Sequence, residues 1–255
     1  MKHRLSGKLT PRWCLPMKAP VIVLLIVLLS FNQAIGQDDD APGTLSYGAK
    51  LGFTMSEFVS SQPHTGGKIG LTVGGFAIYP LSDLLAIQAE LGYLQQGGTY
   101  VQFIDDTRFG APFEFIFRNV KDASVTIHSI YLPVQAKLSL PSESGILPDL
   151  LVGPYVAYNF AATEQYKRTG EIEDRLYATA TGEDVVSDRY EDLQFGVVGG
   201  IQYEIPSTSS LMLIINASYK YGISPVKENH SYIDFTGVVN DLTTQAFIFS
   251  IGVKL

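Results

Sequence analysis

The chain has 255 residues, which is enough for one domain or two small ones. It carries 18 Lys and Arg residues against 25 Asp and Glu residues, and the formal net charge of −7 at pH 7 argues against nucleic-acid binding, which needs a basic surface. A single cysteine, Cys14, leaves no second thiol for an intrachain disulfide bond.

The first 36 residues have the features of a secretory signal peptide. Five Lys or Arg residues and no acidic residue lie within residues 2–18, and the apolar run APVIVLLIVLLSF follows at residues 19–31. Ala34 and Gly36 supply the small side chains expected before a cleavage site. The alternative, a retained membrane helix, would need about 20 apolar residues. We therefore predict cleavage after Gly36, which removes Cys14 and makes the exported chain more acidic.

Residues 37–44, QDDDAPGT, are polar, and we interpret them as a flexible periplasmic leader to one domain at residues 45–255. No later apolar run is long enough for a transmembrane helix. Instead, segments rich in Tyr, Phe, Val, Ile and Gly recur along the chain. They predict eight β-strands, at residues 45–54, 68–80, 85–98, 125–140, 150–161, 192–205, 211–222 and 244–255.

Apolar and polar side chains alternate along these segments. In residues 211–222, for example, Asn216, Ser218 and Lys220 share one face, and the other face carries Leu211, Leu213, Ile215, Ala217, Tyr219 and Tyr221. The polar face carries Gln, Asn, Gly and Ser with few charges, which is typical of the lumen of a small barrel rather than the surface of a soluble sandwich. The alternation assigns eleven side chains to this lumen: Lys50, Gln88, Glu90, Gln135, Lys137, Gln194, Gln202, Glu204, Asn216, Lys220 and Lys254.

A lumen that is only wide enough for side chains requires its charges to be paired. Glu90 and Lys137 lie near the same end of consecutive antiparallel strands, so we expect them to be near neighbours. Glu204 and Lys254 share that level on strands that are not adjacent, which makes them a second candidate pair.

The connections between the predicted strands alternate in length. Those at residues 81–84, 141–149 and 206–210 are short, whereas those at 55–67, 99–124, 162–191 and 223–243 are long. Bacterial outer-membrane barrels sort their connections in this way, with short turns in the periplasm and long loops outside the cell. The sequence therefore predicts an all-β fold, an eight-stranded antiparallel transmembrane β-barrel of the outer-membrane type.

The final segment, FIFSIGVKL, keeps its apolar alternation to the last residue, Leu255. An exposed edge strand of this kind would promote aggregation, so we expect it to pair with residues 45–54 and close the barrel. Several tyrosines fall near predicted strand ends on the apolar face. We interpret them as aromatic girdles at the lipid headgroups, although in a soluble protein they would be core or interface residues; they are Tyr79, Tyr93, Tyr158, Tyr203, Tyr219 and Tyr221.

Several motifs together resemble the PorT-like outer-membrane β-barrel family of Bacteroidetes-type bacteria. They are YGAKLGFTMSEF (47–58), GGFAIYPLSDLLAIQAELGYLQQGGTY (74–100), IYLPVQAKLSL (130–140), LVGPYVAY (151–158), LQFGVVGGIQYEI (193–205), LIINASYKYGISPV (213–226) and FIFSIGVKL. The resemblance covers essentially the whole exported chain. It implies an eight-stranded barrel and, through one branch of the family, a link to protein secretion. The terminal Leu255 differs from the aromatic residue that usually ends such barrels.

Candidates for catalysis or metal binding are few. A barrel lipid hydrolase would need a His and Ser pair, but His128 and Ser129 are adjacent on a strand and should point to opposite faces. His64 and His230 fall in predicted loops. The connection at residues 162–191 is acidic, and its acidic residues are Glu164, Glu171, Glu173, Asp174, Glu183, Asp184 and Asp188. These residues lack the spacing of a calcium-binding loop, which favours a solvated loop and leaves cation binding open. We assign no catalytic, cofactor-binding or metal-binding residue.

These observations favour a non-enzymatic outer-membrane protein that has a structural or binding role through its long extracellular loops. The alternatives are a component or accessory of a secretion apparatus, a lipid-acting barrel enzyme and a small pore. The partners that we expect are outer-membrane lipid and lipopolysaccharide, the barrel-assembly machinery during insertion, and a secretion-system or cell-surface protein, with no nucleic acid.

Overall fold

The computed structural model describes residues 44–59, 65–105, 118–139, 147–172, 176–208, 211–230 and 240–255. The signal peptide and residues 37–43 of the leader lie outside the described residues. Within the ranges given above, no helix is long and apolar enough to cross a membrane.

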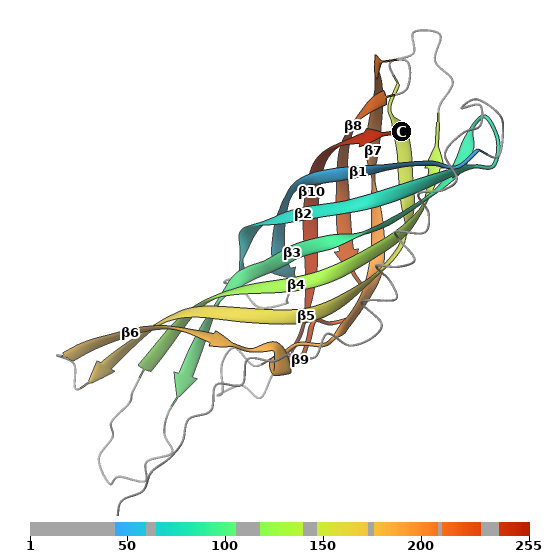
Figure 1. Cartoon of the computed structure of the whole chain (residues 1–255). Coiled ribbons are helices and arrows are strands. Elements are labelled where there is room, and N and C mark those ends of the chain that lie inside the picture. Colours follow the sequence, from blue (N-terminus) through green and yellow to red (C-terminus); the bar gives the residue numbers. More distant parts are fainter. Residues whose placement is uncertain are drawn as a thin grey trace, which may run out of the picture. The chain divides into compact units, whose positions relative to one another are not determined.

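The described residues form a closed antiparallel barrel (Figure 1). The strands neighbour one another in chain order, and β1 pairs with β10 from Gly48 opposite Lys254 to Val59 opposite Thr243, which closes the sheet. Eight strands make the barrel: β1 (Ser46–Val59), β2 (Thr65–Pro80), β3 (Leu85–Asp105), β4 (Arg118–Leu138), β5 (Asp149–Ile172), β7 (Leu193–Thr208), β8 (Leu211–Gly222) and β10 (Asn240–Lys254).

The two ends of the barrel differ. One end holds the short turn at residues 81–84, in which Leu81 N donates to Leu85 O at 2.8 Å, and we call it the turn end. The other end, at the lower left of Figure 1, holds three further elements, and we call it the loop end. These elements are β6 (Leu176–Val185), which pairs with β5, the 3-10 helix η2 (Ser187–Arg189), and β9 (Lys227–His230), which pairs with β10.

The predicted closure of the barrel by the last strand is confirmed. Phe247, Phe249, Ile251 and Val253 on β10 are exposed on the outside, and Phe53 of β1 stacks on Phe249 at a ring distance of 5.3 Å. The same outward apolar pattern runs along β2, β3, β4, β5, β7 and β8, because lipid surrounds this face. The strand count and order predicted from the alternation are therefore correct.

Inward glycines let large rings and neighbouring strands approach closely inside the barrel. Gly74 and Gly92 stand opposite each other on β2 and β3, and a Cβ built on Gly74 would lie 2.8 Å from the Cα of Gly92. The Tyr155 ring lies over Gly196, where an added Cβ would be 2.8 Å from a ring carbon. A narrow barrel needs such small residues where its sheet curves most strongly.

All four predicted long loops are wrong in their bounds, because strands extend into them. The predicted loop 223–243 contains β9, at Lys227–His230, and the start of β10, at Asn240. β1 and β2 leave only residues 60–64 between them, and β3 and β4 leave only 106–117. The predicted loop 162–191 is mostly a hairpin, since β5 continues to Ile172 and returns as β6. Beyond the lipid-facing band the outer face becomes polar, so the hydropathy pattern ends while the backbone pairing continues.

Candidate functional site

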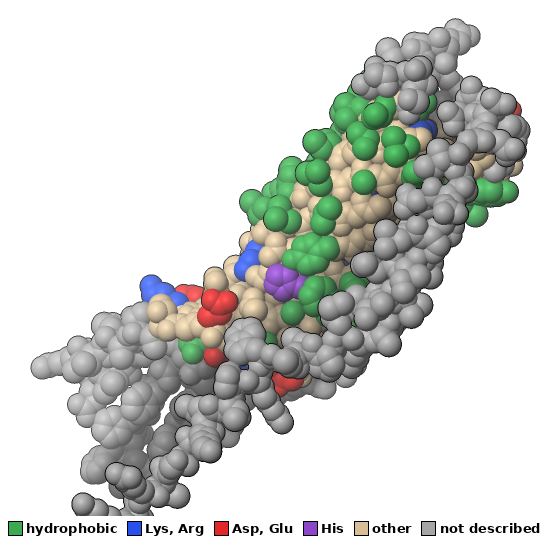
Figure 2. All heavy atoms as spheres, in the orientation of Figure 1, with side chains coloured by type: hydrophobic (Ala, Val, Ile, Leu, Met, Phe, Trp, Pro, Cys, Tyr) green, Lys and Arg blue, Asp and Glu red, His purple; other side chains and the backbone are tan. Residues whose placement is uncertain are grey.

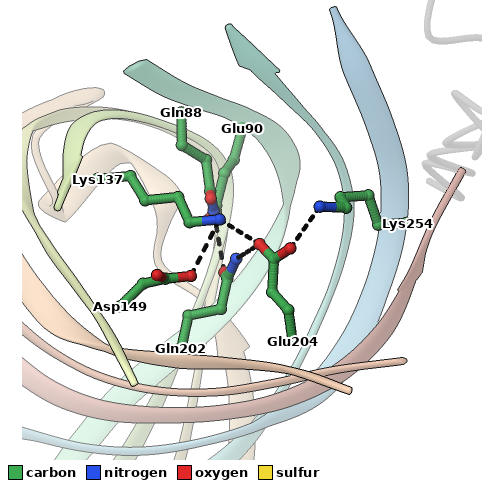
Figure 3. A network of polar contacts seen from close by, with 7 residues as sticks. All are labelled: Gln88, Glu90, Lys137, Asp149, Gln202, Glu204 and Lys254. Atoms are coloured by element: carbon green, nitrogen blue, oxygen red, sulfur yellow. Dashed lines mark hydrogen bonds and ion pairs between the residues drawn. The ribbon is translucent and has the colours of Figure 1, made fainter. Parts of the chain in front are cut away.

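A polar network fills the lumen near the turn end (Figure 3). At its centre, the carboxylate of Glu204 accepts hydrogen bonds from the ammonium groups of Lys137 and Lys254. Lys137 also forms an ion pair with Asp149, with 3.0 Å between Nζ and Oδ2. Each of these lysines therefore has a carboxylate partner, as a charge buried in so narrow a lumen requires.

A further ion pair lies deeper in the same region of the lumen. Lys50 Nζ donates to Glu90 Oε1 at 2.6 Å. Lys50 belongs to β1 and Glu90 to β3, so the lysine side chain must cross β2. It can do so because the residue opposite Lys50 on β2 is Gly74, which has no side chain in the way.

Two glutamines join these ion pairs into one network. Gln88 Nε2 donates to Glu90 Oε1 at 2.9 Å and to Gln202 Oε1 at 3.4 Å, and Gln202 Nε2 donates to Glu204 Oε1 at 3.0 Å. The network contains three ammonium and three carboxylate groups, so its formal charges cancel. A neutral layer of this kind offers no net charge that would draw either cations or anions into the lumen.

The predicted lumen residues all lie on the inner face, and each is buried or half-buried. The pairing of Glu204 with Lys254 is confirmed. Glu90 and Lys137, which we expected to be near neighbours, belong to one network, but their ion pairs are with other residues, because Lys137 stands opposite Ala86 on β3.

Sequence reasoning missed Asp149, which it placed in a turn. Asp149 begins β5 and is in phase with the buried residues Leu151 and Tyr155. That alternation is the signal by which its inward direction could have been found.

A second polar cluster lies nearer the loop end, around Lys220. This side chain is completely buried, and its Nζ donates to Gln96 Oε1 at 2.5 Å, Gln194 Oε1 at 3.3 Å and Thr244 Oγ1 at 3.2 Å. The Nζ also lies 4.8 Å from the centre of the Tyr155 ring, a distance suited to a cation–π contact.

An apolar core closes the lumen at the loop end, and the alternation did not predict it. It brings residues from around the barrel together with Val186 and Tyr190, which flank η2. Within it, Tyr100 Oη donates to Glu164 Oε2 at 2.5 Å. The core consists of Phe58, Tyr100, Ala123, Val125, Ile127, Ala162, Val186, Tyr190, Val226 and Leu242. Val186 and Tyr190 lie in a segment with no regular period, so no sequence pattern could show that it folds inward.

Beyond this core, β3, β4, β5 and β6 continue as a four-stranded sheet that we call the loop-end sheet. Its outer rows follow from the register, with Thr99 opposite Ser124, Ser124 opposite Gln165, and Gln165 opposite Glu183. A groove of about 720 Å³ crosses these strands. Its lining residues are Thr99, Tyr100, Val101, Asp122, Ala123, Ser124, Gln165, Tyr166, Lys167, Thr181, Gly182 and Glu183.

The expected separation of His128 and Ser129 is confirmed. Ser129 is fully buried inside the barrel, where its Oγ donates to Asn159 Oδ1 at 2.6 Å. A hydrogen bond of 2.6 Å joins His128 Nδ1 to Tyr93 Oη on the outer side. His64 lies outside the described residues.

The acidic residues of the predicted loop 162–191 separate into two environments. Glu164 is buried in the lumen, whereas Glu183, Asp184 and Asp188 are exposed. Glu173 and Asp174 lie outside the described residues, and the side chain of Glu171 is not described either. Among the side chains that are described, no group of three or more His, Cys, Asp or Glu could hold a metal ion.

The outer surface divides into an apolar region and a charged region. On the face seen in Figure 2, hydrophobic side chains are spread over the barrel, and most of the Lys, Asp and Glu side chains lie toward the loop end. The tyrosines predicted for the girdles point outward, and Tyr219 on β8 makes a ring contact with Phe247 on β10, with 4.9 Å between the ring centroids. Tyr79, Tyr158, Tyr203, Tyr219 and Tyr221 are exposed, and Tyr93 is half-buried beside His128 and Phe160.

Comparison with solved structures finds small outer-membrane barrels. The chain is similar to Ail, the attachment invasion locus protein of Yersinia pestis, at 9% identity over 84% of this chain and 100% of that chain, with a TM-score of 0.38. It is also similar to OprG from Pseudomonas aeruginosa, at 10% identity over 85% and 98% of the two chains, with a TM-score of 0.36. Neisserial surface protein A gives 15% identity over 83% and 98%, with a TM-score of 0.33.

No curated protein matches the sequence. The family model described as an outer membrane protein beta-barrel domain matches residues 32–228, which is most of the chain. The match agrees with the closed barrel and with its apolar outer face, and it places the protein in the bacterial outer membrane. The chain belongs to the outer membrane protein beta-barrel domain family.

Proposed function

We propose that this protein is a non-enzymatic binding barrel that presents its loop-end sheet at the cell surface. The observation that carries the proposal is the continuation of four paired strands beyond the apolar, lipid-facing band. In outer-membrane barrels the long connections face the outside and the short turns face the periplasm. By that rule the loop-end sheet projects from the cell, where it meets surface and extracellular molecules.

The chemistry of the groove on this sheet favours a polar partner. Its outer rows offer hydroxyl groups from Thr99 and Ser124, an amide from Gln165 and charges of both signs from Lys167 and Glu183. The paired strands hold these groups in a fixed spacing, which lowers the ordering cost of binding. A hydrogen-bonding partner such as a cell-surface protein, or the saccharide of lipopolysaccharide, fits this set of groups.

The base of the sheet meets the edge of the lipid-facing band, where lipopolysaccharide headgroups would lie. Lys68 Nζ donates to Ser124 Oγ at 2.9 Å there. A cationic group at this level supports contact with lipid phosphates, because it attracts their negative charge.

A non-enzymatic role is supported by the positions of His128 and Ser129, the candidate catalytic pair. A His base must lie within hydrogen-bond reach of the nucleophile that it activates. His128 faces outward and Ser129 faces inward, each with another partner, so the pair cannot exchange a proton.

The resemblance to PorT-like proteins favours a second function, as a component or accessory of a protein secretion apparatus. In that case a partner protein would contact the turn end from the periplasm. The barrel-assembly machinery would be a transient partner in either case, because the outer-membrane barrel must be inserted.

A photo-crosslinking residue placed at Gln165 or at Asp83 distinguishes the two functions. Gln165 lies in the groove, and Asp83 lies in the turn at residues 81–84. Irradiation of intact cells, followed by mass spectrometry of the adducts, should give an adduct from Gln165 under the binding proposal. Adducts from Asp83 alone would contradict it and favour the secretion apparatus.

A further inference from the structure

Lys220 differs from the other charged lysines of the described lumen. Lys50, Lys137 and Lys254 each form an ion pair with a carboxylate. Lys220 is completely buried, unlike those three, and its polar contacts within the described part of the chain are all with neutral oxygens. A buried charge needs compensation, so the surroundings of this ammonium must be arranged to supply it.

A closed ring of hydrogen bonds fixes the acceptors around Lys220. Gln96 Nε2 donates to Gln194 Oε1 at 3.0 Å, Gln194 Nε2 donates to Thr244 Oγ1 at 2.5 Å, and Thr244 Oγ1 closes the ring by donating to Gln96 Oε1 at 3.5 Å. Because both amide nitrogens are engaged in the ring, both amide oxygens face the lysine. The amide orientations needed for binding a cation are therefore set by the hydrogen bonds among Gln96, Gln194 and Thr244, and they do not depend on Lys220 alone.

The number of these oxygens also matches the ligand. A primary ammonium has three N–H donors, and Gln96, Gln194 and Thr244 supply three acceptors. The Tyr155 ring adds an aromatic face at 4.8 Å, which favours a cation over a neutral group of the same shape.

We propose that Gln96, Gln194, Thr244 and Tyr155 form a binding site for a primary ammonium ion in the middle of the lumen, and that Lys220 occupies it as a covalently attached ligand. The site is a property of the barrel wall, so it persists when the lysine is shortened. A free alkylammonium of the right length then takes the place of the lysine.

The test is chemical rescue of Lys220→Ala. The substitution deletes three carbon atoms and the ammonium group, and n-propylammonium contains the same atoms. The purified barrel is refolded with the amine present, because the apolar core and the ionic network lie on either side of the site. The urea concentration at half-unfolding of Lys220→Ala should rise with n-propylammonium and then saturate, as expected for one binding site.

Two probes and two proteins serve as controls. Tetramethylammonium has the charge without N–H donors, and 1-propanol has the chain without the charge, so neither should raise the midpoint. Wild type fills the site with its own ammonium group, and Lys220→Met obstructs it with an uncharged side chain, so neither should respond to n-propylammonium. An equal response of Lys220→Ala to tetramethylammonium, or no response to n-propylammonium, would overturn the proposal.

The proposal stays testable if Lys220→Ala does not refold alone. The readout is then the fraction of folded barrel recovered with n-propylammonium, measured by the electrophoretic mobility of the unheated protein. Recovery that depends on this amine supports the site. No recovery under conditions in which Lys220→Met refolds would refute it.

Discussion

The carboxylate of Glu204 serves two ammonium groups at once, and Glu204→Gln keeps the shape of the side chain while it removes the charge. Removing one partner of a buried ion pair costs about 3–5 kcal/mol, because an uncompensated charge stays behind. Lys137 keeps its ion pair with Asp149, so the loss falls mainly on Lys254, whose side chain is 17% exposed. Water can therefore reach Lys254 in part, and we expect a destabilisation of about 3 kcal/mol, at the low end of that range.

Urea unfolding of the refolded barrel in lipid vesicles measures this change in the free energy of unfolding. Glu191→Gln makes the same chemical change at an exposed position and should stay within about 0.5 kcal/mol of wild type. Combining Glu204→Gln with Lys254→Met removes the stranded charge and should recover much of the loss. Equal stabilities of wild type and Glu204→Gln would show that this network does not hold the lumen together.

Three further predictions concern the outer face, the curvature and the exported chain. Ile215→Arg places a charge on the lipid-facing side and should cost about 2–4 kcal/mol near the bilayer centre, whereas Gln165→Arg beyond the band should assemble normally in the same refolding assay. Gly74→Val should block folding, because even a Cβ there would lie 2.8 Å from the Cα of Gly92; the outward Gly75→Val, with its nearest contact at 3.5 Å, should fold, and equal yields would contradict the packing. Mass spectrometry of the exported protein should find Gln37 at its start, and a retained Met1 would disprove cleavage.

The part of the fold that lies in lipid could be predicted from the sequence for a physical reason. Lipid requires apolar side chains outside, and a narrow lumen accepts small or hydrogen-bonding ones, so Leu213 and Ile215 alternate with Ile214 and Asn216. Even there the alternation is imperfect, since Ile214 is apolar and buried within the lumen. The side of the sheet to which a side chain points can thus be read from the two-residue period of the strand. Which residue types fill the lumen, in contrast, depends on packing.

Ion-pair partners could not be predicted in the same way, because they depend on the register between strands. Alternation gives the face on which Lys137 lies, but only the pairing of Lys137 with Ala86 shows how far it is from Glu90. The crossing of Lys50 over Gly74 joins strands that are not neighbours, and no local pattern reports such a contact.

The loop-end sheet was missed because its outer face is polar. Gln165 and Lys167 on β5 meet water or a partner rather than lipid, so the apolar alternation stops where the band stops. The strands continue because their backbone groups still pair, from Thr163 opposite Val185 to Ile172 opposite Leu176. Backbone pairing leaves little trace in hydropathy once the outer face is polar.

The most direct test of the proposed role is the sidedness of the two barrel ends. Cys14 is the only native cysteine, and it lies in the segment predicted to be cleaved, so a single introduced thiol can be labelled without interference. Gln165→Cys places it in the loop-end groove, and Asp83→Cys places it in the turn at residues 81–84. A membrane-impermeant maleimide should label Gln165→Cys on intact cells and Asp83→Cys only after the outer membrane is opened. Labelling of Asp83→Cys on intact cells, with Gln165→Cys protected, would contradict the account.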